Sequence, residues 1–195
     1  VYIRDNSNIL KLKTVSSDHN GVMIRTSGAL LNDLEDEAAD ANVTAKNIIL
    51  EAESAGTGEK ALTTNLVEDK TLPADQNSLT VQTDGAMNIH DIGTEGTAGV
   101  KAESKRECVS VKADRNLVIT GAKGTDVVLE AAGSLTAEEL KATGKVSAMV
   151  ENDIRITNNT GAAFKDLVSR KGGIDLVING NISIDHLAAP GLVNM

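Results

Sequence analysis

Aromatic residues are almost absent from this 195-residue chain, which has one Phe, one Tyr and no Trp. A globular core of this size normally uses large aromatic side chains to fill irregular volume. A narrow core of similar stacked layers can be filled by small aliphatic residues instead, as in solenoid proteins. The shortage of aromatics therefore favours a repetitive, elongated fold over a globule.

Cysteine is represented by Cys108 alone, which excludes an internal disulfide. Cys108 lies beside Val109 in a stretch of alternating apolar residues. A cysteine nucleophile needs a neighbour that favours the thiolate, and no His or Asn signature accompanies this residue. The sequence therefore predicts a buried structural thiol.

Long hydrophobic runs and basic clusters are missing as well. No apolar run approaches the ~18–20 residues that span a bilayer, so we expect no membrane insertion. The net charge is −9, which argues against binding to nucleic acid or to anionic lipid, because both need basic surfaces. The densest acidic run, residues 34–40, is interpreted as a solvated excursion. A cation site is the alternative, although the run lacks the ligand spacing of calcium loops.

No signal peptide is visible, and the chain opens on Val1 rather than Met. We therefore expect a fragment of a longer repetitive protein. Two apolar triplets near the ends share one spacing: Leu10, Leu12 and Val15, and Ile182, Ile184 and Leu187. This match suggests that the fragment spans about one unit of a long tandem array.

The chain is rich in stretches in which every second residue is apolar, separated by Gly, Asn, Asp and Thr. This period of two predicts strands with one buried face. Successive stretches usually start about 8–11 residues apart, a spacing typical of short strands joined by turns. The residues predicted to face inward between positions 106 and 158 are Val109, Val111, Leu117, Ile119, Val127, Leu129, Val146, Ala148, Ile154 and Ile156.

These stretches predict an all-β fold, a right-handed parallel β-helix (β-solenoid) formed by residues 1–195 as a single segment. A repeat of about 20 residues lies within the known range and gives about nine or ten coils. The right hand follows from the preference of parallel crossovers. The alternation falters over residues 54–77 and 159–173, which predicts longer loops or widened coils of unassigned register. Residues 29–41 are the best helical candidate, and residues 136–142 are interpreted as strands.

One motif resembles a cofactor site. Residues 56–61, with Gly56, Gly58 and Ala61, match the G-x-G-x-x-A shape of a dinucleotide-binding turn. A helix should follow, but Thr63 and Thr64 are poor helix formers. A turn between coils is the better interpretation.

The histidines, His19, His90 and His186, lie at no metal-ligand spacing from one another or from cysteine. Structural or solvated roles are expected for them. We accordingly assign no catalytic, cofactor-binding or metal-binding residue, and we expect no cofactor.

The segment from residue 41 to 93 resembles the repeat region of filamentous-haemagglutinin-type exoproteins, which are very large bacterial surface adhesins. The matching pieces are Val43-Thr44-Ala45, Ile48-Ile49-Leu50-Glu51-Ala52, Gly56-Thr57-Gly58 and Leu79-Thr80-Val81. Residues 172–193 resemble the same family's rhythm of G-I-x-I, G-x-I-x-I and A-P-G-x-V. The resemblance implies a right-handed parallel β-helix, export from a bacterial cell, and a role in adhesion or in display of other domains.

The expected function is therefore that of a structural shaft segment in a secreted or cell-surface adhesin, without enzymatic activity. Its expected partners are an unidentified cell-surface receptor and, end to end, further copies of itself. A polysaccharide-active β-helix enzyme is the first alternative, and a cytoskeletal or phage-fibre β-solenoid is the second. The enzyme would need two carboxylates in one groove, usually lined by aromatics. Candidate carboxylates are Asp126, Glu130, Glu138, Glu139 and Asp153.

Overall fold

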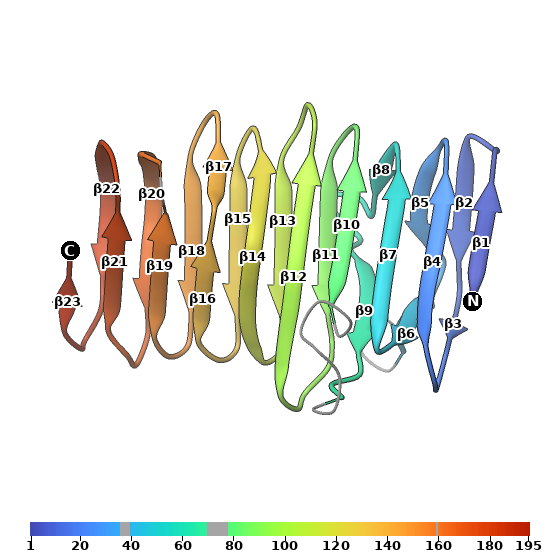
Figure 1. Ribbon diagram of the computed structural model, residues 1–195, viewed down its shortest axis with the longest axis horizontal. Coiled ribbons are helices and arrows are strands. Elements are labelled where there is room, and N and C mark those ends of the chain that lie inside the picture. The colour runs from blue at the N-terminus through green and yellow to red at the C-terminus, as the bar shows by residue number, and fades with distance from the viewer. Residues whose placement is uncertain (36–39, 70–77, 159) are drawn as a thin grey trace.

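The computed structural model describes residues 1–35, 40–69, 78–158 and 160–195. In this part of the chain every regular element is a β-strand and no helix is present, so no helix there could span a membrane. The strands form two parallel sheets that run along an elongated molecule (Figure 1). The prediction of an all-β fold is confirmed.

The sheet nearer the viewer in Figure 1 is called the front sheet, and the other the back sheet. The front sheet consists, in order, of β1 (Tyr2–Asp5), β4 (Gly21–Thr26), β7 (Asn47–Ala52), β10 (Leu79–Thr83), β12 (Thr97–Ser104), β14 (Asn116–Gly124), β16 (Leu135–Glu138), β19 (Ile154–Asn158), β21 (Ile174–Ile178) and β23 (Val193–Asn194), with β17 (Leu140–Ala142) also beside β14. The back sheet consists of β2 (Ile9–Leu12), β5 (Ala29–Asn32), β8 (Ser54–Ala55), β11 (Met87–Asp91), β13 (Val109–Ala113), β15 (Val127–Ala131), β18 (Val146–Val150), β20 (Ala162–Ser169) and β22 (Ile182–Ala188). Three further strands, β3 (Val15–Ser16), β6 (Val43–Ala45) and β9 (Leu62–Leu66), form a side ladder that joins the back sheet through β11.

The chain follows one repeated path. It runs along a front strand, crosses to the back sheet, returns along a back strand and re-enters the front sheet one strand further on (Figure 1). Equivalent strands of successive coils pair in parallel, as Leu117 does with Leu135 and Leu135 with Ile154. The result is the expected right-handed β-solenoid, with about 9 turns.

The core lies between the two sheets and is aliphatic. All ten residues predicted to face inward between positions 106 and 158 are at most 1% exposed. Residues 136–142 form β16 and β17, as predicted, with Ala137 and Leu140 buried. The period of two therefore identified the buried face correctly, because strands between two sheets expose alternate side chains to the core.

The alternation falters at residues 159–173 for a local reason. The prediction of a longer loop is wrong here, because a strand, β20, occupies Ala162–Ser169. Its pairing with β18 shifts by one residue after Phe164. The bulge leaves Lys165 unpaired and moves the inward positions from Phe164 to Leu167, so the period of two is broken once. Within 54–77, β8 and β9 are strands joined by a loop, and residues 70–77 lie outside the described residues.

Two sequence-based predictions are wrong. Cys108 is exposed rather than buried, because Val109 holds the inward phase of β13 and the residue before it belongs to the turn. The helical candidate at 29–41 begins with the strand β5, whose Leu30 is fully buried in the back sheet. Residues 36–39, which include much of the acidic run, lie outside the described residues.

The match between the two end triplets is also displaced. The back-sheet register carries Leu10 through successive coils onto Ile184, and not onto Ile182. The equal spacing of the triplets therefore aligns residues from different columns of the solenoid.

Candidate functional site

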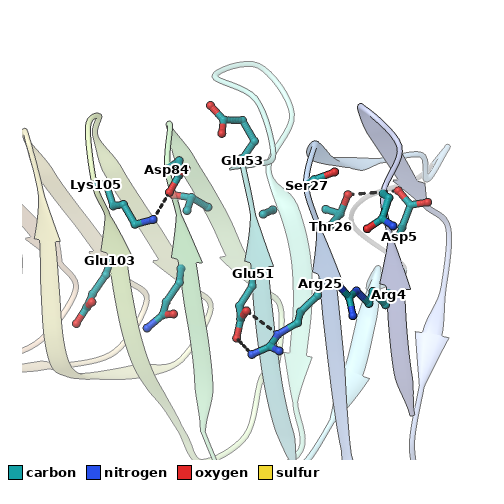
Figure 2. Close-up of a pocket in the computed structure, with 14 residues that line it drawn as sticks. Arg4, Asp5, Arg25, Thr26, Ser27, Glu51, Glu53, Asp84, Glu103 and Lys105 are labelled. Carbon is teal, nitrogen blue, oxygen red and sulfur yellow. Dashed lines mark hydrogen bonds and ion pairs between the residues drawn. The ribbon is translucent and has the colours of Figure 1, made fainter.

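A hollow of about 780 Å³ lies on the outer surface of the front sheet, where β1, β4, β7, β10 and β12 end (Figure 2). The sheet forms its floor. The turns that lead to the back sheet form its rim, with Ser27, Glu53 and Lys105 among the rim residues. The hollow therefore runs across five strands, along the axis of the solenoid.

The floor of the hollow is a single column of outward side chains, one from each strand. Register pairs connect the members of the column from one coil to the next, and neighbouring strands are about 4.8 Å apart. The column consists of Arg4, Arg25, Glu51, Gln82 and Glu103.

Most charges in the hollow are paired within the protein. Arg25 makes a two-pronged contact with Glu51, with Nε 2.6 Å from Oε2 and Nη2 2.8 Å from Oε1. At the rim, Lys105 Nζ lies 2.5 Å from Asp84 Oδ1, and hydrogen bonding from Lys105 lowers the pKa of the Asp84 carboxyl. The hollow therefore presents fixed, paired donors and acceptors rather than one strong charge.

Two floor residues are available to a ligand. Within the described part of the chain, no hydrogen bond or ion pair involves the side chain of Arg4 or of Gln82. Figure 2 shows Arg4 at one end of the row, beside the Arg25–Glu51 pair. The guanidinium of Arg4 offers donors, and the amide of Gln82 offers both donors and an acceptor.

The pKa values of two carboxyls in the hollow, Asp5 and Asp84, are shifted in the direction opposite to that of a general acid. A catalytic carboxylic acid needs a pKa raised towards the working pH. In the hollow, hydrogen bonds to Ser7 lower the pKa of Asp5, and Lys105 lowers that of Asp84. Both groups are thereby held in the ionised form, as in a structural ion pair.

A carboxyl with the opposite shift lies in the interior. Burial raises the pKa of Asp91, while Arg115 and the amide of Leu66 act against that rise. The side chains of Arg115 and Asp91 are only 4% and 1% exposed, and Arg115 Nη2 lies 2.7 Å from Asp91 Oδ2. Arg115 also donates to the carbonyl oxygens of Leu66 at 2.6 Å and Glu95 at 2.5 Å.

This buried ion pair connects three coils. Leu66 belongs to the side ladder, Asp91 ends β11, and Arg115 follows β13. Gly93 lies directly against the guanidinium, since a Cβ built on it would be 2.6 Å from Arg115 Cζ. The pair also underlies a second hollow of about 520 Å³ beside the side ladder. With its polar atoms paired, it is a structural clamp.

The carboxylates named as candidates for the enzyme alternative are not gathered in either hollow. None of Asp126, Glu130, Glu138, Glu139 and Asp153 lines one of them. Asp126 and Asp153 instead accept hydrogen bonds from backbone amides of the next coil, from Lys145 and Gly173. Their oxygens stabilise turns, because they bind N–H groups that the ladder leaves unpaired.

The histidines occupy separate positions. His90 lies 2.9 Å from Asp114, His186 lies 3.2 Å from Asp166, and His19 is exposed. Each pair joins adjacent coils. Over the described residues, no group of three or more His, Cys, Asp or Glu could hold a metal ion.

The G-x-G-x-x-A motif forms a turn, as interpreted from the sequence. It lies in the loop between β8 and β9, where the Thr57 amide donates to the Lys60 carbonyl at 2.7 Å. Gly56 has a φ of +67°, a conformation that favours glycine. A strand, β9, follows the loop, whereas a dinucleotide-binding turn leads into a helix.

The sequence contains a pattern that indicates burial of both members of the Arg115–Asp91 pair. Asp91 follows Met87 and Ile89 at a period of two, and Arg115 follows Val111 and Ala113 in the same way. Both charges therefore fall in inward phase, where a charged group needs a partner. The floor column of the hollow could not be recognised in this way. Its residues are in outward phase, and outward positions of a solvated sheet are ordinarily polar.

Comparison with known proteins does not identify a family: no protein-family model, no curated protein and no solved structure matches this chain.

Proposed function

We propose that this chain is a structural shaft segment of a bacterial secreted or surface adhesin of the filamentous-haemagglutinin type. Its work is to hold binding or effector regions at a fixed distance from the cell. The observation that supports this role best is the continuous pair of parallel ladders from β1 to β23. A rod of this kind gains length by adding coils, since each coil contacts mainly its neighbours.

Ion pairs between neighbouring coils support the same role. Arg25–Glu51, Lys105–Asp84 and Arg155–Asp175 each join adjacent strands of the front sheet or the turns that follow them. Exposed pairs of this kind contribute little to the free energy of unfolding, because solvent screens them. Because they link coils along the axis, they favour one register and oppose sliding of one coil over the next.

The alternative of a polysaccharide-active enzyme has weaker support. The hollow on the front sheet contains carboxylates, but Glu51 and Asp84 are paired with cations. An acid–base pair for glycoside chemistry needs two carboxyls whose environments separate their pKa values. The lowered pKa values of Asp5 and Asp84 do not provide that separation.

Distance measurement by double electron–electron resonance tests the rod. Spin labels are attached at Gln82→Cys and Val177→Cys, both exposed and five front-sheet strands apart, in a Cys108→Ser background. Deletion of residues 117–134 brings Leu135 into the place of its register partner Leu117. We expect a narrow distance distribution that shortens by about 4.8 Å, one coil spacing. A broad distribution, or an unchanged distance, contradicts a rigid coil-by-coil spacer.

A half-coil deletion is the matched control. Removal of residues 117–125 takes out β14 but leaves β15, so the two sheets lose their alternation and the chain should unfold. Surface placement is tested separately with antibodies against residues 1–195 on intact cells of the source bacterium. Labelling that appears only after permeabilisation would overturn the surface assignment.

A further inference from the structure

We propose that the hollow on the front sheet binds an extended, uncharged glycan chain that lies along the solenoid axis. The site is the floor column of Arg4, Arg25, Glu51, Gln82 and Glu103, with the turns above it. This binding function goes beyond that of a spacer, and it involves no chemical step.

The geometry of the column sets the direction and the repeat of the ligand. The five side chains come from five successive strands, so the row runs perpendicular to the strands. Its spacing of about 4.8 Å is that of parallel strands. One sugar residue in an extended glycan has a similar length, so each coil can present one polar side chain to each sugar.

The chemistry of the column fits hydroxyl groups. Arg25 and Glu51 hold each other in a fixed, planar arrangement, and Glu103 is fixed by Lys101 at 3.2 Å. Planar groups with paired donors or acceptors suit neighbouring sugar hydroxyls, which both donate and accept hydrogen bonds. Gln82 lies between Glu51 and Glu103 in the row, and its side-chain amide has no partner in the described part of the chain.

The charge balance selects against ionic glycans. Arg25 and Lys105 are neutralised by partners in the hollow. Arg4 has no described partner, but a single exposed guanidinium is not the concentrated positive charge that a sulfated or uronate polymer needs. The net charge of −9 also opposes an acidic polymer. An uncharged chain incurs neither penalty.

A polypeptide is the less suitable occupant. In an extended peptide, side chains on one face recur at every second residue, about 6.6–6.8 Å apart. That distance does not match the strand spacing, and the floor lacks apolar pockets that would anchor such side chains. The hollow is open and contains no aromatic residue, so each site is expected to bind weakly and to gain strength from repetition along an array.

Nuclear magnetic resonance titration of the ¹⁵N-labelled chain tests the proposal. Cellohexaose is the uncharged probe, hexagalacturonate the acidic probe, and an uncharged hexapeptide of Ser and Thr the peptide probe. We expect cellohexaose alone to shift backbone amides at the ends of β4, β7, β10 and β12. Absence of these shifts at millimolar cellohexaose, equal shifts with hexagalacturonate, or shifts with the peptide instead would each overturn the proposal.

Substitutions locate the site. Gln82→Ala and Arg4→Ala remove side chains that have no described partner, so they should leave the fold intact. The double variant is expected to weaken cellohexaose binding at least tenfold. Lys123→Ala is the matched control, because Lys123 continues the same column beyond the hollow. Equal weakening by the control would contradict the assignment, whereas the spin-label distances would still test the spacer independently.

Discussion

Arg115 Nη2 and Asp91 Oδ2 lie 2.7 Å apart in the interior of an otherwise aliphatic solenoid, with both side chains almost completely buried. Two charges in such a place need each other, because an isolated charge in the core costs far more than a paired one. The Arg115–Asp91 clamp also bonds to Leu66 of the side ladder. It therefore ties the side ladder to the regular coils.

Arg115→Met should destabilise the chain by about 3–5 kcal/mol, because it leaves the Asp91 carboxylate buried without an opposite charge. Arg155→Met is the control, since Arg155 is exposed and pairs loosely with Asp175 at 3.8 Å. It should cost less than about 0.5 kcal/mol. Urea unfolding measures both, and equal midpoints would show that the clamp contributes nothing to stability.

Gly93→Ala tests how closely the backbone packs on the clamp. The added methyl would lie 2.6 Å from Arg115 Cζ, and backbone on both sides limits how far the guanidinium can move. A loss of about 1–3 kcal/mol is expected, as for overpacking elsewhere. Gly58→Ala, which would meet no atom within 4 Å, should be neutral or slightly stabilising. Thermal unfolding of the two variants compares them directly.

The phase of the core is tested by neighbouring substitutions in β15. Leu129 is fully buried, and Leu129→Asp would place an unpaired charge in the core at a cost of several kcal/mol. Glu130 points outward, and Glu130→Lys should change the free energy of unfolding by less than about 0.5 kcal/mol. Similar urea midpoints for the two variants would contradict the register.

Acid should weaken the turn at Glu151. Hydrogen bonding from Lys171, together with the nearby charge of Arg170, lowers the pKa of this carboxyl in the folded state. Its stabilising contribution is therefore present above about pH 4.3, the ordinary glutamate pKa, and is lost as pH falls through the lower folded value. In Glu151→Gln, the urea midpoint should fall less as the pH is lowered. If the urea midpoint of the variant falls with pH as steeply as that of the unaltered chain, Glu151 does not contribute to this loss of stability.

Asp91 contributes with the opposite sign. Its folded pKa is raised, so the folded state holds a proton that the unfolded state has already released. Stability from this group falls as pH rises from the unfolded to the folded pKa. The pH dependence of the urea midpoint therefore combines two contributions of opposite sign, from Glu151 and from Asp91. Urea unfolding of Asp91→Asn over the same pH range removes the Asp91 contribution and measures it by difference.

End-to-end association is expected when residues 1–195 are produced alone. Exposed large apolar residues gather in the first and last coils, at Tyr2 and Ile9 and at Val177, Ile182 and Leu192. The outer strands there also have unpaired edges. Sedimentation should show assembly that grows with protein concentration and with salt, which screens acidic repulsion. A single monomeric species throughout would contradict this expectation.

The fold could be predicted from the sequence because the solenoid repeats one local rule. Val111, Leu129 and Ile156 each stand in an alternating stretch, and each is buried in its own coil. The same alternation specifies which residues face outward. One inserted residue, such as Lys165 in β20, exchanges the inward and outward positions of the residues that follow it. Cys108 was misplaced because an apolar neighbour does not reveal where a turn ends.

The clamp and the hollow depend on relations between coils of unequal length. The coil from Ile48 to Leu79 is much longer than the coil from Leu117 to Leu135. The alternation of apolar residues indicates that Asp91 and Arg115 both face inward. Only the pairing of strands between coils shows that the two side chains are in contact. The column under the hollow is likewise a product of register, since its five members are spread from residue 4 to residue 103.

The side ladder has a consequence for orientation. A solenoid of identical coils looks the same at every step along its axis and offers a partner no landmark. Here β3, β6 and β9 form a ladder beside the N-terminal coils, and in the described part of the chain no such ladder continues beyond β11. The side ladder therefore marks one side of the solenoid and one part of its length. A neighbouring structure can recognise that shape without contacting any particular side chain.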